Sequence, residues 1–316
     1  MESDLNSKML TGLRNTRDLR AEILDMAAAL LTHEGQYQLE VIAPLITTRT
    51  VWAEWERLLP ALAPGIRERL SLSVSKGKPV ATVGRNVAPL DRPNYRYEAL
   101  RLLLASALGV YPPSNLRELI GRIGASQTPV RAALSALRDA EIVQGNRPLQ
   151  VDPESLSSDL LSRIGALPQQ LRFRFERGTQ IKTPSTLLGR ARALLGDDGP
   201  KEWRSWALSG VPVAHVDVPM IDLVGIPRID LIAHAGRGTD EFQACAIGML
   251  DDGLELEPNM LAPAPVVLTL VRADVCDTRT AGSQSTRCAC ANDVLLALYD
   301  AGLREQAIQY ARAMRR

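Results

Sequence analysis

The stretch NLRELIGRIGASQTPVRAALSALRDAEIV, residues 115–143, decides how the rest of the chain is interpreted. Its apolar side chains repeat at helical spacing in two blocks, which predicts a helix, a tight turn and a second helix before a short strand. Gly124 is expected to end the first helix, because glycine takes the left-handed conformation without a Cβ penalty. Ser114 and Ser126 are expected to cap the two helices. The predicted buried residues are Leu116, Leu119, Ile120, Ile123, Val130, Leu134 and Leu137.

The second predicted helix carries small polar and arginine side chains opposite its apolar stripe. The spacing resembles a bacterial helix-turn-helix, and VQGNRPLQV at 143–151 resembles the two-stranded wing of winged-helix domains, with Gly145-Asn146 as its turn. That resemblance implies groove contacts by the second helix and phosphate contacts around it. The expected DNA-binding residues here are Ser126, Gln127, Thr128, Arg131, Ser135, Arg122, Arg138, Asn146 and Arg147. The alternative is a helical hairpin with a solvated polar face.

The composition is that of an ordinary soluble globular protein of two or three domains: 316 residues, 46% hydrophobic and 23% charged. Aromatic residues make up 4%, which argues against single-strand binding through stacked bases. No apolar run approaches the ~18 residues of a membrane span. The N-terminal MESDLNSKMLTG lacks the apolar core of a secretory signal, and four cysteines do not make a disulfide scaffold. A cytoplasmic protein without membrane contact is expected.

The net charge is only +1, but the positive charge is concentrated in two segments. Residues 92–147 hold eight arginines against four acids, and residues 163–192 hold seven bases against one. In the second segment, LRFRFERG at 171–178 alternates apolar residues with arginines, which predicts a strand with one cationic face. Arg172 and Arg174 are therefore expected to contact DNA beside the recognition helix. The alternative is a solvated edge strand whose arginines discourage aggregation.

Residues 1–90 predict a small α/β region, with helices at 13–32 and 50–62 and strands at 37–46, 70–74 and 79–83. The order of strand and helix also suggests a nuclease core, but Glu40 is the only strand carboxylate, so a structural or partner-binding role is expected. The segment 81–94 is predicted to be a linker. A helix at 95–107 then opens the winged-helix unit, residues 95–155.

The C-terminal half predicts helices at 153–164 and 208–214, strands at 227–233, 242–250 and 264–271, and a helical pair at 291–314 broken at Gly302. The motifs WALSG at 206–210, RIDLI at 228–232 and the terminal DVLLALYDAGLREQAIQYARAM are similar to the nucleotidyltransferase-like domain of AbiEi-type proteins. These are the antitoxin and repressor halves of type IV toxin–antitoxin pairs. The resemblance covers about residues 95–316 and implies an α+β fold, with a nucleotidyltransferase-like domain at 165–316.

A nucleotidyltransferase needs two carboxylates, two residues apart, to hold Mg²⁺. Asp230 stands alone on its predicted strand, because residue 232 is Ile, and Asp217 and Asp222 are out of register. We therefore expect a degenerate domain and no catalytic residues, cofactor or metal. Cys276, Cys288 and Cys290 are expected on a mobile polar loop whose spacing is not that of a zinc site, even with His215 or His234 as a further ligand. No hydrolase triad or P-loop motif is present.

The sequence thus predicts a sequence-specific, double-stranded DNA-binding transcriptional regulator. It is expected to repress its own operon, and the resemblance adds a cognate toxin or a homodimer as protein partners. A nucleotidyltransferase-like enzyme and a winged helix that binds protein instead of DNA stay open as alternatives.

Overall fold

The computed structural model describes residues 5–11, 16–32, 35–42, 48–75, 87–176, 179–223, 225–259, 262–273, 277–281 and 285–315. The fold is mixed α+β, as expected, with a seven-stranded mixed sheet in its larger part. The chain forms two compact units. The first comprises residues 1–87, 175–181 and 243–255, and the second comprises 88–174, 182–242 and 256–316. Residues 95–155 and 165–316, expected as two parts, lie mostly within the second unit.

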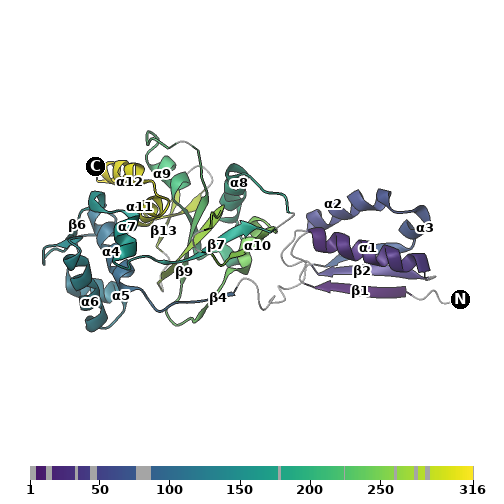
Figure 1. Ribbon diagram of the computed structural model, residues 1–316, viewed down its shortest axis with the longest axis horizontal. Helices are drawn as coiled ribbons and strands as arrows, with labels where there is room; N and C mark the ends of the chain where they lie inside the picture. Colours follow the sequence, from purple (N-terminus) through teal and green to yellow (C-terminus); the bar gives the residue numbers. More distant parts are fainter. Residues whose placement is uncertain are drawn as a thin grey trace. The chain divides into compact units, whose positions relative to one another are not determined.

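The first unit is a three-stranded parallel sheet in the order β1-β2-β3, with helices packed on it (Figure 1). The helix predicted at 13–32 has Leu19, Ile23, Met26, Ala27 and Leu30 on one stripe by helical spacing. This stripe is buried and packs with the apolar residues of β2 and β3. Strand β1 was not predicted, because its exposed Ser7, Lys8 and Met9 give it no apolar run. The elements are β1 (Leu5–Thr11), α1 (Thr16–Thr32), β2 (Gln36–Ile42), α2 (Thr48–Leu58), η1 (Leu59–Ala61), α3 (Pro64–Arg67) and β3 (Leu70–Ser75).

Glu40 of β2, the residue weighed for a nuclease site, is in register with Met9 and Ser73. Neither neighbour is a carboxylate, and among the described residues Glu40 belongs to no group of three or more acidic, His or Cys side chains that could hold a metal ion. The strand expected at 79–83 lies outside the described residues.

Three helices and a short hairpin gather at one end of the second unit (Figure 1). They are α4 (Tyr95–Ala107), α5 (Leu116–Ile123), α6 (Gln127–Asp139), and the antiparallel β5 (Val143–Gln144) and β6 (Gln150–Val151). The predicted stripe of α6, Val130, Leu134 and Leu137, is buried, which confirms its inner face. On α5, Leu119 and Ile123 are buried whereas Leu116 and Ile120 are half-buried.

The large sheet has the order β11-β7-β12-β9-β8-β14-β13. Strand β9 runs parallel to β12 and antiparallel to β8, and β7 is antiparallel to β12. The strands are β7 (Gln169–Phe175), β8 (Trp206–Ser209), β9 (Ile229–Ala235), β11 (Leu254–Glu257), β12 (Val266–Arg272), β13 (Thr278–Ala281) and β14 (Thr286–Ala289). Its helices include α7 (Ser158–Arg163), α8 (Pro184–Leu194), α9 (Val211–Asp217), α11 (Ala291–Asp300) and α12 (Arg304–Met314).

Several expected boundaries are wrong where a turn interrupts an apolar run. The helix expected at 208–214 is the end of β8 followed by α9, because Gly210 takes φ 63° between them. The strand expected at 242–250 is β10 (Glu241–Gln243) with the helical turns η4 (Ala244–Ala246) and α10 (Ile247–Leu250). The linker expected at 81–94 contains β4 (Val87–Pro89), which pairs with β10. The helix at 153–164 is broken into η2 (Pro153–Ser155) and α7.

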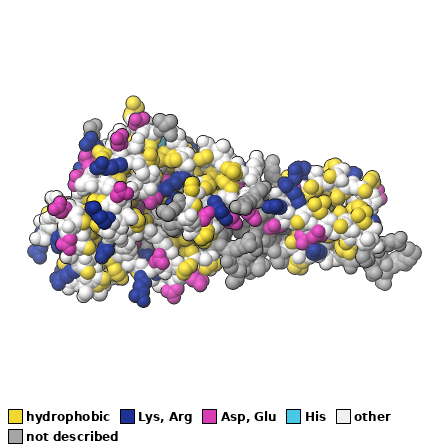
Figure 2. Space-filling model, viewed as in Figure 1, with side chains coloured by type: hydrophobic (Ala, Val, Ile, Leu, Met, Phe, Trp, Pro, Cys, Tyr) yellow, Lys and Arg dark blue, Asp and Glu magenta, His cyan; other side chains and the backbone are white. Residues whose placement is uncertain are grey.

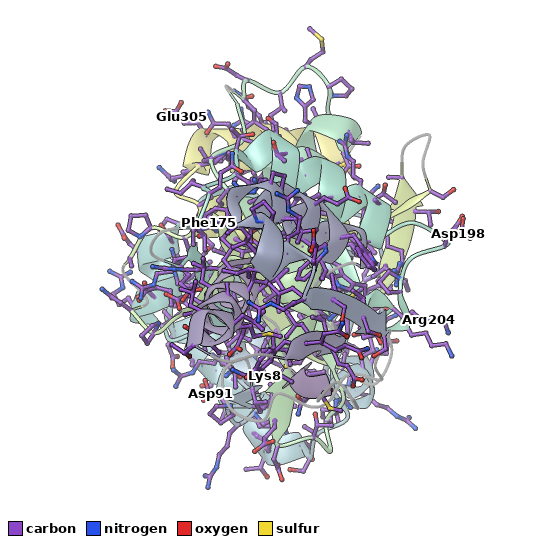
Figure 3. The ribbon with its side chains drawn as sticks, turned by 90° about the vertical axis from the view of Figure 1, so that its right-hand side faces the viewer. Lys8, Asp91, Phe175, Asp198, Arg204 and Glu305 are labelled. Atoms are coloured by element: carbon purple, nitrogen blue, oxygen red, sulfur yellow. The ribbon has the colours of Figure 1, made fainter. Side chains whose placement is uncertain are left out.

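Large aromatic side chains fill the core of the second unit between β8 and the segment before it. Trp203 of η3 (Lys201–Trp203) and Trp206 of β8 are buried, with ring centroids 4.7 Å apart. Asp198, before η3, and Arg204, between the two tryptophans, project to the outside (Figure 3). The indole pair therefore anchors the start of β8 and fixes where Ser209 and Gly210 emerge at the end of that strand.

Candidate nucleic-acid interface and the pocket behind it

Helix α6 presents its expected outer face to solvent. Gln127, Thr128, Arg131, Ser135 and Arg138 are all exposed, whereas the stripe on the opposite side of the helix is buried. With its amide oxygen turned toward Arg131, Gln127 accepts hydrogen bonds from that guanidinium at 2.7 and 3.2 Å. An amide and a guanidinium held side by side form a donor and acceptor pair of the kind that reads base edges.

The turn between α5 and α6 is fixed by caps that differ in part from those expected. Gly124 ends α5 in the left-handed region at φ 63°, as expected. Asn115, not Ser114, caps α5 by a capping box with Glu118, since Ser114 is buried. Ser126 stands at the N-cap position of α6, but its side chain makes no capping hydrogen bond, so that expectation is wrong. The Ser126 side chain is exposed.

A groove lies between α5, α6 and the β5–β6 hairpin, and we call it the arginine groove. The described side chains that line it include four arginines and no carboxylate. The guanidinium groups of Arg117 and Arg147 make no hydrogen bond or ion pair with the described residues, so their charge is not compensated locally. Figure 2 shows Lys and Arg side chains over this end of the second unit. The lining residues are Asn115, Leu116, Arg117, Ile120, Gln127, Arg131, Leu134, Arg138, Asn146, Arg147 and Leu149.

Arg138 holds the hairpin against α6. Its guanidinium donates to the Gly145 carbonyl at 3.3 Å and to Asn146 Oδ1 at 2.9 Å. The expected phosphate contact Arg122 is exposed but stacks on the Tyr111 ring, with 4.0 Å from its Cζ to the ring centroid. Arg117 lines the groove but was not among the residues predicted from the sequence. The signal that could have identified it is its position in the first turn of α5, next to the cap residue. The structure therefore brings together Arg131, Arg138, Asn146 and Arg147 and adds Arg117.

Strand β7 does not offer the cationic face that was expected. Arg172 is half-buried and donates to the Ala262 carbonyl at 3.0 Å, and exposed Arg174 pairs with Glu257 at 3.2 Å. The edge-strand alternative is also wrong, because β7 lies between β11 and β12. Both side chains bind groups within the sheet. We therefore no longer include these two arginines in the DNA surface that the charge of residues 163–192 predicted.

Arg101, counted in the cationic segment, is buried in an ion pair. Its Nε and Nη2 donate to the two carboxylate oxygens of Asp293 at 2.6 and 2.8 Å, and both side chains are less than 5% exposed. Asp293 lies in the first turn of α11, where the helix dipole also favours a negative charge. This pair joins α4 to the sheet domain, and it contributes nothing to a phosphate-binding surface.

The described residues on either side of 282–284 in the cysteine segment form paired strands, where a loop was expected. Strands β13 and β14 pair across it, Cys288 is buried, and Cys290 is half-buried. Cys276 lies outside the described residues. His215 is exposed and His234 is buried on β9. Within the part of the chain that the structure describes, no group of three or more His, Cys, Asp or Glu side chains is placed to hold a metal ion.

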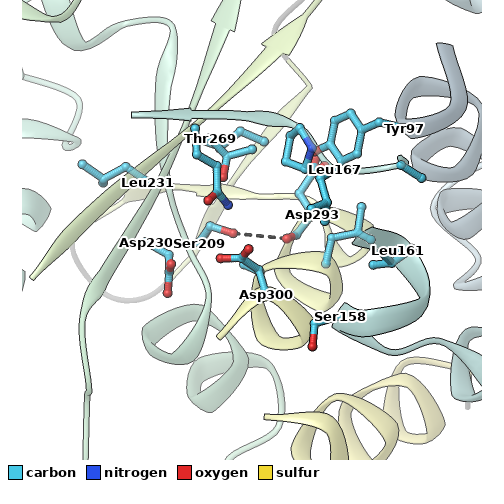
Figure 4. Close-up of a pocket in the computed structure, with 16 residues that line it drawn as sticks. Tyr97, Ser158, Leu161, Leu167, Ser209, Asp230, Leu231, Thr269, Asp293 and Asp300 are labelled. Atoms are coloured by element: carbon cyan, nitrogen blue, oxygen red, sulfur yellow. Dashed lines mark hydrogen bonds between the residues drawn. The ribbon is translucent and has the colours of Figure 1, made fainter. Parts of the chain in front are cut away.

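A pocket lies behind the helices, between α4, α7, α11 and the strands β7, β9 and β12 (Figure 4). We call it the Asp230 pocket, and the space left inside its lining is about 20 Å³, which is room for about one water molecule. It is lined by Tyr97, Ser158, Leu161, Ala166, Leu167, Pro168, Gln170, Ser209, Asp230, Leu231, Ile232, Thr269, Asp293, Leu296, Ala297 and Asp300. Its apolar walls come from the helices and β9, and its polar groups come mostly from strand ends and α11.

Asp230 is the buried carboxylate of this pocket. Arg228 Nε donates to Asp230 Oδ1 at 2.8 Å, and Arg228 Nη2 donates to Asp300 at 2.5 Å. Asp230 Oδ2 has no hydrogen-bond partner among the described residues. Burial raises the pKa of Asp230 to about 6, against the opposing effect of Arg228. A Cβ on Gly210 would lie 2.3 Å from Asp230 Oδ2, so this position accepts only glycine.

Three comparisons with known proteins were made. No protein-family model, curated protein or solved structure matches the chain. None of the helices described is both long and apolar enough to span a membrane.

The buried carboxyl group of Glu98 on α4 makes the stability of the second unit depend on pH. Burial raises its pKa from 4.5 to about 7, and its carboxylate is placed 3.4 Å from the backbone N–H of Arg272. The folded state therefore binds this proton more tightly than the unfolded state. The stabilisation is complete below the ordinary pKa of 4.5 and is lost as pH rises through about 7.

Glu98→Gln keeps the shape of the protonated group and cannot ionise. We expect the free energy of unfolding of the variant to rise relative to wild type between pH 4.5 and pH 7, and then to level off, with a total gain of up to about 3 kcal/mol. Urea unfolding at several pH values measures it. A difference that is flat with pH would show that Glu98 ionises normally in the folded chain.

Proposed function

We propose that this chain is a sequence-specific, double-stranded DNA-binding transcriptional regulator, in which α4, α5, α6 and the β5–β6 hairpin act as a winged helix-turn-helix. The observation that carries the proposal is the arginine groove: four arginines, two of them without local partners, face outward from α5, α6 and the hairpin with no carboxylate among them. Uncompensated cations on a concave face are what a phosphate backbone requires.

The roles within the groove follow from position. Arg131 and Gln127 lie together near the start of α6, the part of a recognition helix that reaches base edges. A guanidinium pairs bidentately with guanine and an amide with adenine. Arg117 and Arg147 lie on the flanking elements and suit phosphates. Arg138, which is bonded to the hairpin turn, positions the hairpin.

We further propose that the protein represses its own operon, with a nucleotidyltransferase-like second part that does not catalyse. The order β8, Gly210, α9 and β9, with Asp230 on β9 against Gly210, supports the AbiEi-type resemblance. On that resemblance, a cognate toxin or a second copy of the chain is the protein partner. Footprinting of the DNA upstream of the gene tests the repressor role, and rescue from the product of a neighbouring gene tests the antitoxin role.

The close approach of Gly210 and Asp230 also favours an alternative function, nucleotidyl transfer. In both cases a strand-turn-helix lies against a carboxylate. Against it, Arg228 binds one oxygen of Asp230 and one oxygen of Asp300, so an arginine already bridges the two carboxylates. Mg²⁺-dependent transfer of labelled nucleotide that Asp230→Ala abolishes would establish the enzyme. DNA affinity that does not respond to salt would instead favour a winged helix that binds protein.

Arg172 and Arg174 of β7 provide a matched comparison for the arginines of the groove. We expect Arg172→Ala with Arg174→Ala to leave the salt dependence of DNA binding unchanged, because both side chains have partners within the sheet. Arg117→Ala, the control in the groove, should reduce the slope of log K against log salt by about 1. Fluorescence anisotropy at several salt concentrations measures both. A flattened slope in the sheet variant would return β7 to the interface.

A further inference from the structure

Two contacts join the end of α5 to the loops of the large sheet, and both meet at Arg122. Arg237, in the loop after β9, donates from Nη2 to the backbone carbonyl of Arg122 at 2.8 Å. The Arg122 guanidinium stacks on the ring of Tyr111, whose hydroxyl donates to Asp277 Oδ2 at 2.6 Å. We call this set of four residues the Arg122 clamp. The side chain that was predicted to contact phosphates is thus engaged within the second unit.

The clamp lies against the turn between α5 and α6. A Cβ on Gly124, the residue that ends α5, would lie 1.6 Å from Arg237 Nη1, so the guanidinium covers the turn closely. The carbonyls in the last turn of a helix lack partners within that helix, and the helix dipole favours a cation beside them. Arg237 therefore satisfies the C-terminal end of α5 from outside the three helices.

Both outer ends of the clamp are themselves fixed to the sheet. Arg272, the last residue of β12, donates to the backbone carbonyls of Thr239 at 2.8 Å and Arg237 at 3.2 Å, which holds the loop after β9. The backbone carbonyl of Asp277 accepts from Cys290 Sγ, just before α11, at 3.6 Å. The clamp therefore connects the end of α5 to two separate elements, β12 and the start of α11.

Helix α6 depends on neighbouring elements for its position. It packs on α4, α5 and β5, and among the described residues no hydrogen bond or ion pair joins it to the large sheet. Its first residue, Gln127, follows Gly124 by only three positions, and Arg131 lies one turn further on. Hydrogen bonds to base edges weaken steeply when distance or angle departs from the ideal, so a small shift of the turn is felt at these two side chains.

We propose that the Arg122 clamp positions the recognition helix, so that the large sheet determines how accurately α6 reads base sequence. Arg237 and Tyr111 are positioning residues, which act through Arg122 and the turn at Gly124 and do not touch DNA. This inference rests on the proposed function. Phosphate contacts give affinity for any sequence, whereas base contacts give specificity. Loss of the clamp should therefore reduce specificity and leave general affinity for DNA in place.

The test is DNA binding by the full chain carrying Arg237→Ala and Tyr111→Phe, which keeps the ring under Arg122 and removes only the bond to Asp277. We expect binding to DNA from upstream of the gene to weaken at least about fivefold, and binding to an unrelated sequence to change less than about twofold. The slope of log K against log salt should stay as in wild type. Equal losses on both DNAs with a slope reduced by about 1 would mean that Arg237 contacts phosphate directly, and would overturn the proposal.

Two single variants separate the bond from the charge. Arg237→Lys keeps a cation that can donate to the Arg122 carbonyl, and we expect it to bind the upstream DNA within about twofold of wild type. Arg204→Ala removes the same charge from an exposed side chain of the second unit outside the clamp, and should change neither affinity nor specificity. A loss of specificity in Arg204→Ala equal to that of the double variant would show that the clamp has no special part in it.

Hydrogen exchange tests the clamp without DNA. We expect the backbone amides of residues 120–127 to exchange at least about threefold faster in the double variant, while the melting temperature falls by no more than about 3 °C. Unchanged exchange in this segment would overturn the clamp, whatever the DNA result. If the wild-type chain binds no DNA but exchange still rises in the variant, the proposed function fails and the clamp remains as a contact that holds the turn.

Discussion

Arg101→Met is expected to lower the free energy of unfolding of the second unit by roughly 3–5 kcal/mol, because it leaves the Asp293 carboxylate buried without its partner. Both oxygens of Asp293 now accept from Arg101, at 2.6 and 2.8 Å, and neither side chain reaches solvent appreciably. Methionine fills much of the arginine volume, so the loss reports charge and not a cavity.

The measurement is urea unfolding followed by tryptophan fluorescence in a Trp52→Phe, Trp55→Phe background. In that background the signal comes from Trp203 and Trp206, which are buried in the second unit. The control is the double variant Arg101→Met, Asp293→Leu, which removes both charges and should recover most of the lost stability. A single variant as stable as wild type would mean that the pair is solvated and does not join α4 to α11.

The second large effect concerns DNA affinity. We expect replacement of Arg117, Arg131, Arg138 and Arg147 by alanine to weaken DNA binding by about 10³-fold near physiological salt. If Arg117 and Arg147 each neutralise one phosphate, the slope of log K against log salt should fall by about 2. The side chains are exposed, so the free energy of unfolding should change little by comparison.

The matched control replaces four arginines of the second unit that are also exposed and do not line the groove: Arg96, Arg163, Arg190 and Arg204. It changes the net charge by the same amount, and we expect it to keep most of the affinity, because its charges lie away from the groove. Equal losses in the two variants would show that overall charge, and not the arginine groove, governs binding. Circular dichroism of both variants checks that the fold is retained.

Local pattern predicted the helices of this chain well. Helical periodicity over a few turns predicts the bounds of α4 at 95–107 and the buried stripe of α1. The break between the two terminal helices follows from Gly302, which takes a positive φ. The outer face of α6 was predicted for the same reason, since its two stripes are set by helical spacing alone. These features need no information from distant residues.

Pairings between distant segments could not be predicted in this way. Arg101 and Asp293 are 192 residues apart, and nothing in either local pattern distinguishes an arginine that pairs in the core from one that faces DNA. The partners of Arg172 and Arg174 come from the segment around 257–262, which gave no signal of its own. Counting charge along the chain therefore overstated the cationic surface.

The measurement that tests the central claim most directly is the affinity of the full chain for DNA from upstream of its gene, at several salt concentrations, for wild type and Arg131→Ala. The account predicts that wild-type log K falls with log salt with a slope of about −2 or steeper, because at least Arg117 and Arg147 neutralise phosphates. It also predicts that Arg131→Ala loses about tenfold or more on this DNA and much less on an unrelated sequence. Binding that ignores salt, or an Arg131→Ala affinity within about threefold of wild type on the upstream DNA, would contradict it.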